Sequence, residues 1–501
     1  MNIKQAKTQV KYAIESYLTK DDDGEYRIQT ERQRPIFLMG PPGIGKTAII
    51  EQIAQELGIS AVSYSMTHHT RQSAVGLPYI KEEQFDGVPQ RVTEYTMSEI
   101  LASVYETIEK TGIREGILFL DEINCVSETL APSILQFLQY KIFGRHRLPD
   151  GWILVTAGNP PEYNRSVREF DIATWDRLKR IDVEPDLDTW LGYAAGARVH
   201  PAITSYLKIR RNDFYIVKNT LEGTEFVTAR SWTDLSDMLT LYEEKGFPVD
   251  DDLLSQYIQT DEAARNFASY YMLFRKYREE YPVRAILSGD VDSKTKKHVN
   301  AAKMDERISI LGLLLEPVNQ ACFEIEASDR MMRLLQRELK AARDAEGDAP
   351  WKDRIEGIID SVKDDVARTK DASSISEADL RACRRAIEVL RGMQQELGFT
   401  PNDQDYETIQ HLFMKENKAL GDRIAETRSQ MSAIFAFFEG VEHSENEMLL
   451  LVTELTANPY TSAFISRYDC EDYFRHSDAL KFNDREIRLN DEIGKLDLDE
   501  A

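Results

Sequence analysis

The sequence has 501 residues, with 86 Asp and Glu against 62 Lys and Arg, which gives a formal net charge of −24. At roughly 150 residues per domain, this length predicts about three domains. Hydrophobic residues make up 42% and charged residues 30%, as is typical of a folded globular protein rather than a disordered one. The acidity argues against a protein that coats nucleic acid or binds an anionic membrane, because both need Lys and Arg against phosphates.

The four cysteines, Cys125, Cys322, Cys383 and Cys470, form no CxxC pair. This spacing argues against a disulfide scaffold and a cysteine zinc site, and it favours a reducing compartment. Residues 1–18 show helical periodicity and repeated charge rather than the pattern of a signal peptide. No stretch approaches the roughly 20 apolar residues that a membrane span needs. We therefore expect a soluble cytoplasmic protein with no membrane partner.

The first 185 residues alternate short apolar runs with helical patterns. Five runs rich in Val, Ile and aromatic residues are predicted as buried strands, at 34–40, 60–65, 116–120, 152–156 and 180–183. Short buried strands separated by helices are typical of a parallel sheet that is covered on both faces. Residues 1–185 are therefore predicted to form an α/β domain with a five-stranded parallel sheet.

The strand signal fades beyond residue 186. Amphipathic patterns predict a small all-helical domain over 186–285, with helices at 188–195, 201–207, 231–245 and 251–281. The polar, breaker-rich stretch 288–297 predicts a loop or linker within 286–304. A helical domain is predicted over 305–501, as antiparallel hairpins or a coiled coil, from patterns at 330–343, 351–369, 377–397 and 404–439.

A phosphate-binding motif follows the first predicted strand. The pattern GxxxxGK[ST] is matched by Gly40, Pro41, Pro42, Gly43, Ile44, Gly45, Lys46 and Thr47, and Ala48 begins the next predicted helix. Glycines let successive backbone N–H groups turn toward phosphate oxygens, and the helix start adds unpaired donors. Lys46 would neutralise the β- and γ-phosphates, and the Thr47 hydroxyl would bind magnesium. A strand before the motif and a helix after it argue against a chance glycine-rich turn.

Two other predicted strands lead to polar residues. Residues 117–120 run into Asp121 and Glu122, and the strand 152–156 is followed by Asn159. Open α/β sheets bind ligands at the carboxyl ends of their strands. There Asp121 would hold magnesium through water, Glu122 would orient or deprotonate the attacking water, and Asn159 would hydrogen-bond that water and the γ-phosphate. Alone, the acidic pair is a weak signal, because acids after a buried strand also cap turns, but downstream of a phosphate loop it becomes a strong one. Asn159 alone would be interpreted as an ordinary turn residue before Pro160 and Pro161.

The order of these motifs resembles the AAA+ ATPases, and within them the MoxR-type branch, over roughly residues 30–245. The resemblance rests on residues 40–47, 118–124, 148–160, 176–181 and 226–232. It implies an AAA+ core over 1–185, an all-α lid over 186–285 and a mainly α-helical C-terminal extension. It also implies an enzyme that hydrolyses ATP to ADP and phosphate, with ATP and Mg²⁺ as cofactors.

The resemblance also implies roles for single residues. Lys46 and Thr47 would be the Walker A pair, Asp121 and Glu122 the Walker B pair, with Thr47 and Asp121 at the metal, and Asn159 would be sensor 1. A further role falls to Arg230, which matches sensor 2 at the start of a lid helix.

The family's arginine finger, which reaches the γ-phosphate held by a neighbouring subunit, falls at Arg177. Here Leu178 replaces the usual Phe and Arg180 follows closely, so the choice between Arg177 and Arg180 stays open. Arg165 and Arg168 are weaker candidates, and for each arginine the alternative is a surface salt bridge.

The family carries an insertion after the second strand, and residues 66–95 fit it as a long polar loop that could line the central pore of a hexamer. His68 and His69 lie in this stretch without Cys, Asp or Glu at ligand spacing, so we expect loop residues rather than a metal site.

An arginine finger that acts in trans implies a ring of identical subunits, most often a hexamer. The MoxR resemblance implies ATP-driven remodelling, activation or maturation of a partner protein, often one with a von Willebrand A domain. One alternative is a nucleic-acid motor, which the acidity and the lack of a dense basic patch disfavour. Another is a nucleotide-gated assembly scaffold, which the intact acidic pair disfavours. The phosphate loop does not exclude GTP, but the lack of an NKxD motif favours ATP.

Overall fold

The computed structural model describes residues 1–68, 76–85, 88–163, 167–168, 170–219, 223–345, 349–372, 375–397 and 404–478. The chain divides into two compact units. The first comprises Met1–Thr189 and Gly357–Leu380, and the second comprises Trp190–Glu356 and Arg381–Ala501.

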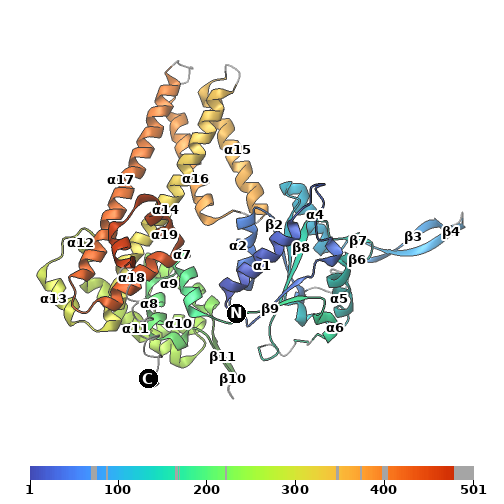
Figure 1. The fold of residues 1–501 in the computed structure, drawn as a ribbon, viewed down its shortest axis with the longest axis horizontal. Coiled ribbons are helices and arrows are strands. Elements are labelled where there is room, and N and C mark those ends of the chain that lie inside the picture. The colour runs from blue at the N-terminus through green and yellow to red at the C-terminus, as the bar shows by residue number, and fades with distance from the viewer. Residues whose placement is uncertain are drawn as a thin grey trace, which may run out of the picture. The chain divides into compact units, whose positions relative to one another are not determined.

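The first unit is built on a five-stranded sheet with strand order β2-β5-β8-β1-β9 (Figure 1). All neighbouring strands are parallel, with bounds Ile36–Met39 for β1, Ser60–Ser65 for β2, Gly116–Asp121 for β5, Trp152–Gly158 for β8 and Lys179–Asp182 for β9. The predicted five-stranded parallel sheet is therefore confirmed. Because Met39 is in register with Gly158, and Ser65 with Asp121, the carboxyl ends of these strands meet at one edge of the sheet.

Helices cover both faces of this sheet (Figure 1). Alternate strand residues, among them Phe37, Leu118 and Leu154, pack in one buried cluster with residues of α4 (Glu99–Thr111) and α5 (Ala131–Tyr140). The helices on the other side are α1 (Ile3–Leu18) and α2 (Lys46–Leu57). Burial on both faces explains why the strands are continuous apolar runs rather than alternating ones.

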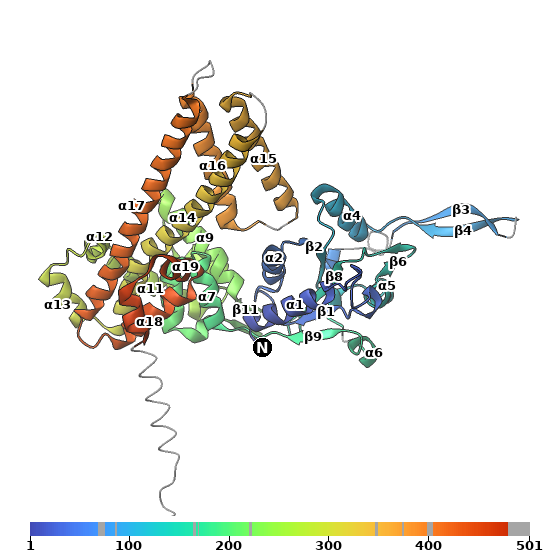
Figure 2. The ribbon, with the colours of Figure 1, turned by 45° about the horizontal axis from the view of Figure 1, so that its top comes forward.

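The stretch 66–95, predicted as a loop, instead carries a β-hairpin that extends from the first unit (Figure 2). Its strands are β3 (Pro78–Phe85) and β4 (Val88–Tyr95), after the short 3₁₀ helix η2 (Met66–His68). Cross-strand polar contacts hold it, because the Tyr79 hydroxyl donates to Glu94 at 2.6 Å and Lys81 also pairs with Glu94. Strands held by charged pairs lack the apolar run that marks the sheet strands.

Several short elements complete the first unit. They are η1 (Thr30–Arg32), η3 (Ile123–Cys125), β6 (Ile142–Phe143), β7 (His146–Arg147) and α6 (Ile172–Trp175).

The second unit is mainly helical. It contains residues of α7 (Leu187–Gly196), α8 (Pro201–Ile209), η4 (Arg211–Asp213), α9 (Ala229–Lys245), α10 (Asp251–Tyr257), α11 (Asp261–Glu280), α12 (Val283–Leu287), α13 (Ser293–Ala301), α14 (Met304–Asp344), α15 (Trp351–Asp371), α16 (Glu377–Glu396), α17 (Asp405–Glu439), α18 (Glu445–Ala457) and α19 (Pro459–Tyr468). Its α7, α15 and α16 also contribute residues to the first unit. These helices agree with the predicted mainly α-helical C-terminal part.

Three details of this unit differ from the sequence prediction. The predicted all-helical lid contains a two-stranded hairpin of β10 (Ile216–Asn219) and β11 (Thr224–Val227). The predicted helix 251–281 is two helices, α10 and α11, because the chain leaves helical geometry near Ile258. The predicted loop 288–297 includes the start of α13, where the Asp292 side chain caps the helix by accepting from Thr295 N at 2.7 Å.

Helix α14 is the central helix of the second unit. It contacts α8, α11, α17, α18 and α19, and it continues through Pro317. By length and composition alone α14 could cross a membrane, but 61% of its most apolar window is buried inside the protein. Such burial is typical of the core helix of a globular unit.

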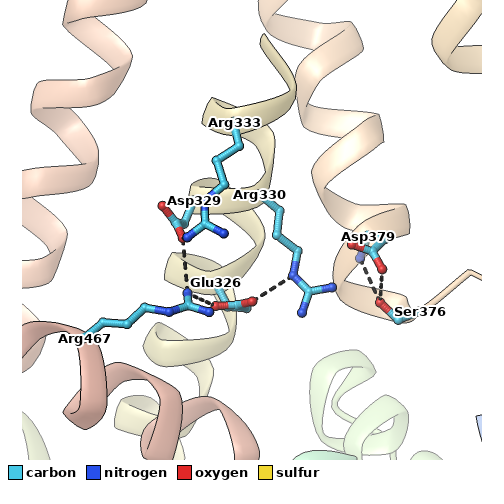
Figure 3. Close-up of polar contacts among 7 residues, drawn as sticks. All are labelled: Glu326, Asp329, Arg330, Arg333, Ser376, Asp379 and Arg467. Carbon is cyan, nitrogen blue, oxygen red and sulfur yellow. Dashed lines mark hydrogen bonds and ion pairs between the residues drawn. The ribbon is translucent and has the colours of Figure 1, made fainter. Parts of the chain in front are cut away.

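An ion-pair network joins α14 to α19 (Figure 3). The Glu326 carboxylate, almost fully buried, accepts from Arg330 at 2.8 Å and from Arg467. Asp329 accepts from Arg467 at 3.1 Å and from Arg333 at 2.6 Å. Burial opposes the charge on Glu326, but the hydrogen bonds from the two arginines outweigh it and lower the pKa of this carboxyl.

Candidate active site

The turn between β1 and α2 has the geometry of a phosphate-binding loop. Gly43 and Gly45 have φ values of 73° and 93°, in the left-handed region that favours glycine. Gly45 is the N-cap of α2 and offers no side-chain cap to the first N–H groups of the helix. A Cβ atom on Gly40 would lie 2.7 Å from the carbonyl oxygen of Val183, so glycine is required there too. The loop therefore exposes unpaired backbone donors at the positive end of a helix dipole, which suits a phosphate group.

Lys46 is buried beside this loop, with 7% of its surface exposed. Its Nζ donates to the carbonyl oxygens of Gly40 at 2.7 Å and Pro41 at 2.9 Å, and to Oδ1 of Asn159 at 2.9 Å. The structure thus brings the predicted Walker A lysine and the predicted sensor 1 residue into direct contact.

Thr47 and Asp121 supply oxygen atoms from the helix start and from the end of β5. The Thr47 hydroxyl donates to Oδ2 of Asp121 at 3.3 Å, and Oδ1 of Asp121 accepts from Glu122 N at 2.8 Å. A hydroxyl and a carboxylate at this spacing are the hard oxygen donors that Mg²⁺ prefers, so the residues fit the predicted metal.

Glu122 follows Asp121 with a φ of 54°, an uncommon value for a residue other than glycine. Oε2 of Glu122 accepts from the Thr67 hydroxyl at 3.1 Å and from the Ser65 hydroxyl at 3.4 Å. Thr67 and Ser65 were not predicted from the sequence, although Ser65 ends β2 beside Asp121 of β5 and Thr67 follows in η2. These hydroxyls hold the carboxylate that would orient water.

Asn124 is a third residue of the site that the sequence did not predict. It is buried, and its Nδ2 donates to the backbone oxygen of Asn159 at 2.8 Å. A Cβ atom on Gly158 would lie 2.5 Å from Oδ1 of Asn124, so a larger residue at position 158 would displace the Asn124 side chain. Glycine at the end of β8 therefore allows Asn124 to hold the backbone of Asn159. The sequence shows Asn124 two residues after the Asp121–Glu122 pair, but it does not show that Asn124 contacts Asn159.

The pKa of the Cys125 thiol reflects the negative charge of the site. Burial raises the pKa of its thiol, and the carboxylates of Glu122 and Asp121 raise it further. The thiol is therefore a poor nucleophile, and the negative charge of the acidic pair favours a bound cation.

The arginines considered for the finger differ in their surroundings. Arg177 is exposed, makes no ion pair with any residue that the structure describes, and lines a cavity of about 350 Å³ together with residues of α5. Arg180 instead pairs with Asp182 at 2.8 Å and lies over the ring of Trp175 at 4.8 Å. Arg168 pairs with Glu128 at 2.8 Å, and Arg165 lies outside the described residues.

Arg230 belongs to the second unit, where it is the second residue of α9 and is exposed. The Thr228 side chain caps this helix by accepting from Ser231 N at 3.3 Å, and the Ser231 hydroxyl accepts from Thr228 N at 3.2 Å. This reciprocal cap fixes the helix turn that carries Arg230.

The contacts therefore assemble Lys46, Thr47, Asp121, Glu122 and Asn159 at the carboxyl edge of the sheet. No hydrogen bond or ion pair joins Arg177 to them in the described part of the chain. Among the described residues, no group of three or more His, Cys, Asp and Glu side chains could hold a metal. His69 lies outside the described residues. The catalytic roles of the assembled residues remain predictions.

Residues 36–171 match the family model described as "ATPase family associated with various cellular activities (AAA)". A search of the curated proteins finds no match to this chain. Among solved structures, the chain is similar to a RuvB mutant from Thermotoga maritima, with 15% identity and a TM-score of 0.30 over 57% of this chain and 76% of that chain. The family match, together with the sheet and the phosphate loop, shows that the first unit contains a nucleotide-binding AAA ATPase domain.

Proposed function

We propose that this chain hydrolyses ATP and uses the energy to remodel, activate or mature a partner protein, as the MoxR-type AAA+ proteins do. The observation that carries the proposal is the direct contact of Lys46 with Asn159, beside the Thr47–Asp121 pair, in a matched AAA domain. A nucleotide-binding module without turnover would not need Glu122 held at the same edge by two hydroxyl groups.

The proposed mechanism follows from these contacts. The N–H groups at the start of α2 and the Lys46 ammonium would bind the β- and γ-phosphates, and Thr47 and Asp121 would hold magnesium. The metal would supply charge neutralisation for the transferred phosphoryl group. Glu122 would accept a proton from the attacking water, and the side-chain amide of Asn159 would orient that water against the γ-phosphate.

Catalysis would require a second copy of the chain. The exposed Arg177 makes no ion pair with a described residue, so it can offer its guanidinium to a neighbouring subunit without first breaking one, whereas Arg180 already has two partners. This difference supports Arg177 as the arginine finger and a homo-oligomeric ring, which we propose is a hexamer. Arg230 would act as sensor 2.

The partner is proposed to be a protein rather than nucleic acid. The β3–β4 hairpin exposes apolar side chains, with Ile80 73%, Phe85 50% and Val88 55% accessible, and its charged residues are of both signs. Exposed apolar side chains suit a protein partner, which could carry a von Willebrand A domain, better than a phosphate backbone. We also propose that the chain works in the cytoplasm.

The proposal is tested with Glu122→Gln, which should bind ATP but turn it over slowly and so trap the partner. The variant is used as bait with ATP, and Lys46→Ala, which should bind ATP far more weakly than wild type, is the matched control at an ATP concentration that fills only the Glu122→Gln site. A protein that is enriched only with Glu122→Gln and ATP supports the proposal. Recovery of nucleic acid alone, or stimulation of ATPase activity by DNA or RNA in a salt-dependent manner, would favour a nucleic-acid motor. A wild-type chain that releases no phosphate from ATP would leave only the scaffold alternative.

A further inference from the structure

A cavity of about 830 Å³ lies within the second unit, where the end of α8, strand β10 and the start of α11 contribute to its lining. It is lined by residues 209–213 and 215–218, together with Thr260, Glu262 and Ala263. Its volume lies in the range of small-molecule sites, which is roughly 300–1,000 Å³. We infer that this cavity is a second ligand site, which binds a small phosphorylated molecule and is separate from the proposed ATPase chemistry.

The first support is the charge of the lining. Arg210, Arg211 and Lys218 all line the cavity and are exposed. Arg210 and Lys218 make no ion pair with any residue in the described ranges. The described lining carries these three cations against two carboxylates, Asp213 and Glu262, so in a chain with a net charge of −24 it has a local excess of positive charge that would attract an anion.

The acidic residues of the lining have partners of their own. The Tyr206 hydroxyl donates to the Asp213 carboxylate. Burial, and then this carboxylate, raise the pKa of Tyr206, so the hydroxyl keeps its proton. Glu262 lies in the first turn of α11, where the helix dipole favours a carboxylate. Neither acid forms an ion pair with Arg210 or Lys218 in the described part of the chain, so these two guanidinium and ammonium groups stay available to an anion.

The second support is Thr260, which is only 2% exposed. Its hydroxyl is buried and has no hydrogen-bond partner among the described residues. Thr260 is the N-cap of the 20-residue helix α11, yet its side chain makes no capping hydrogen bond. A buried hydroxyl without a hydrogen-bond partner lowers folding stability unless a ligand accepts or donates a hydrogen bond to it. A phosphate oxygen could accept from this hydroxyl and from the uncapped N–H groups of the first turn.

The apolar residues that line the cavity indicate that the bound anion also has an apolar organic group. Ile209, Tyr215, Ile216 and Val217 contribute apolar and aromatic surface to the same cavity. A free phosphate ion would leave most of that surface uncovered, whereas a phosphomonoester of nucleotide size would cover it. The expected ligand is therefore a phosphorylated small molecule with a flat or apolar portion.

The experiment is calorimetric titration of AMP, and of inorganic phosphate, into the full chain saturated with Mg²⁺ and ADP, so that the phosphate loop is already filled. AMP should bind at one site, more tightly than phosphate does. Arg210→Glu and Lys218→Glu should each weaken AMP binding at least tenfold. Lys276→Glu, a charge reversal at an exposed position on the same helix α11, is the control and should leave binding unchanged.

Thr260→Val gives a second readout, because it keeps the shape of the side chain and removes the hydroxyl. The variant should melt at a higher temperature than wild type without ligand, since an unsatisfied polar group is gone, and it should bind AMP more weakly. Binding of neither AMP nor phosphate, AMP affinity that survives both charge reversals, or binding of a phosphoserine peptide alone would overturn the inference. The readout is binding, so the result stands whether or not the chain hydrolyses ATP.

Discussion

Nζ of Lys46 lies 2.9 Å from Oδ1 of Asn159, although 113 residues separate them in the chain. The contact joins the start of α2 to the end of β8 across the carboxyl edge of the sheet. It makes the phosphate loop and the predicted sensor 1 residue one hydrogen-bonded unit, and the first prediction follows from it.

Lys46→Ala should lower ATP affinity by roughly 100-fold, because the buried ammonium supplies charge-assisted contacts to phosphate. Asn159→Ala should keep ATP binding and lower turnover, since its amide would act on the attacking water. Binding of a fluorescent ATP analogue and phosphate release, measured on both variants, separate the two effects. Equal losses of affinity in both variants would contradict this division.

Glu122→Gln should retain ATP binding and lose roughly 100-fold or more in turnover, because the amide cannot accept the proton of water. Thr67→Val removes the hydroxyl that donates to Oε2 of Glu122 and keeps the shape of the side chain. We expect a fall of roughly 3- to 10-fold in kcat with an unchanged KM, as a positioning contact is lost. A changed KM with a normal kcat would place Thr67 at the substrate instead.

Arg177→Ala should lower turnover by roughly 1,000-fold without loss of ATP binding, because arginine fingers stabilise charge only in the transition state. Arg180→Ala is the matched control and should have a smaller effect. Mixing Arg177→Ala subunits with Lys46→Ala subunits should restore activity, since each supplies what the other lacks across an interface. Mixtures that stay inactive would argue against action in trans.

Lys141 predicts a pH dependence of stability. Burial lowers the pKa of its ammonium from 10.5 to about 8, while Nζ donates to the Thr30 carbonyl oxygen. Between pH 8 and 10.5 the unfolded chain therefore binds more protons at this residue than the folded chain. Folding stability of wild type, relative to Lys141→Met, should rise over this window by up to about 1.4 kcal/mol per pH unit. Denaturant titrations of both proteins from pH 7 to 10 measure the difference, and parallel curves would contradict it.

The ion-pair network around Glu326 predicts that a single variant loses more folding stability than the corresponding double variant. Arg467→Met should lower the free energy of unfolding by about 1–3 kcal/mol. The nearly buried Glu326 carboxylate would then keep only the hydrogen bond from Arg330 to offset the cost of its burial. The double variant Glu326→Met with Arg467→Met should recover much of this loss, since no buried charge remains. Thermal and denaturant unfolding of the two proteins decide the point; an equally unstable double variant would show that packing, rather than charge, dominates.

The sequence predicted those parts of the fold that repeat a simple pattern. Continuous apolar runs such as 116–120 predicted the sheet strands, because parallel strands are buried on both faces. The β3–β4 hairpin was missed because its strands are held by charged pairs such as Lys81 with Glu94, in a stretch rich in turn residues. The start of α13 was missed because its capping residue, Asp292, lies among residues that also favour loops.

For the candidate site, motif spacing predicted the side chains on the loop and at the strand ends. It did not predict Thr67, Ser65 and Asn124, because their importance depends on contacts across the sheet edge. Spacing also could not rank Arg177 against Arg180. The structure separates them by a local feature, the Asp182 and Trp175 partners that only Arg180 has.

Helix α14 runs through 41 residues, which is roughly 60 Å at 1.5 Å per residue. One part of it packs against α8 and α11, and the same helix packs against α17 and α19. Close-packed interiors transmit strain. A shift of α8 would therefore be passed through α14 to α17 and α19, and Pro317, which lacks a backbone N–H, is the position in α14 where the helix would bend most easily.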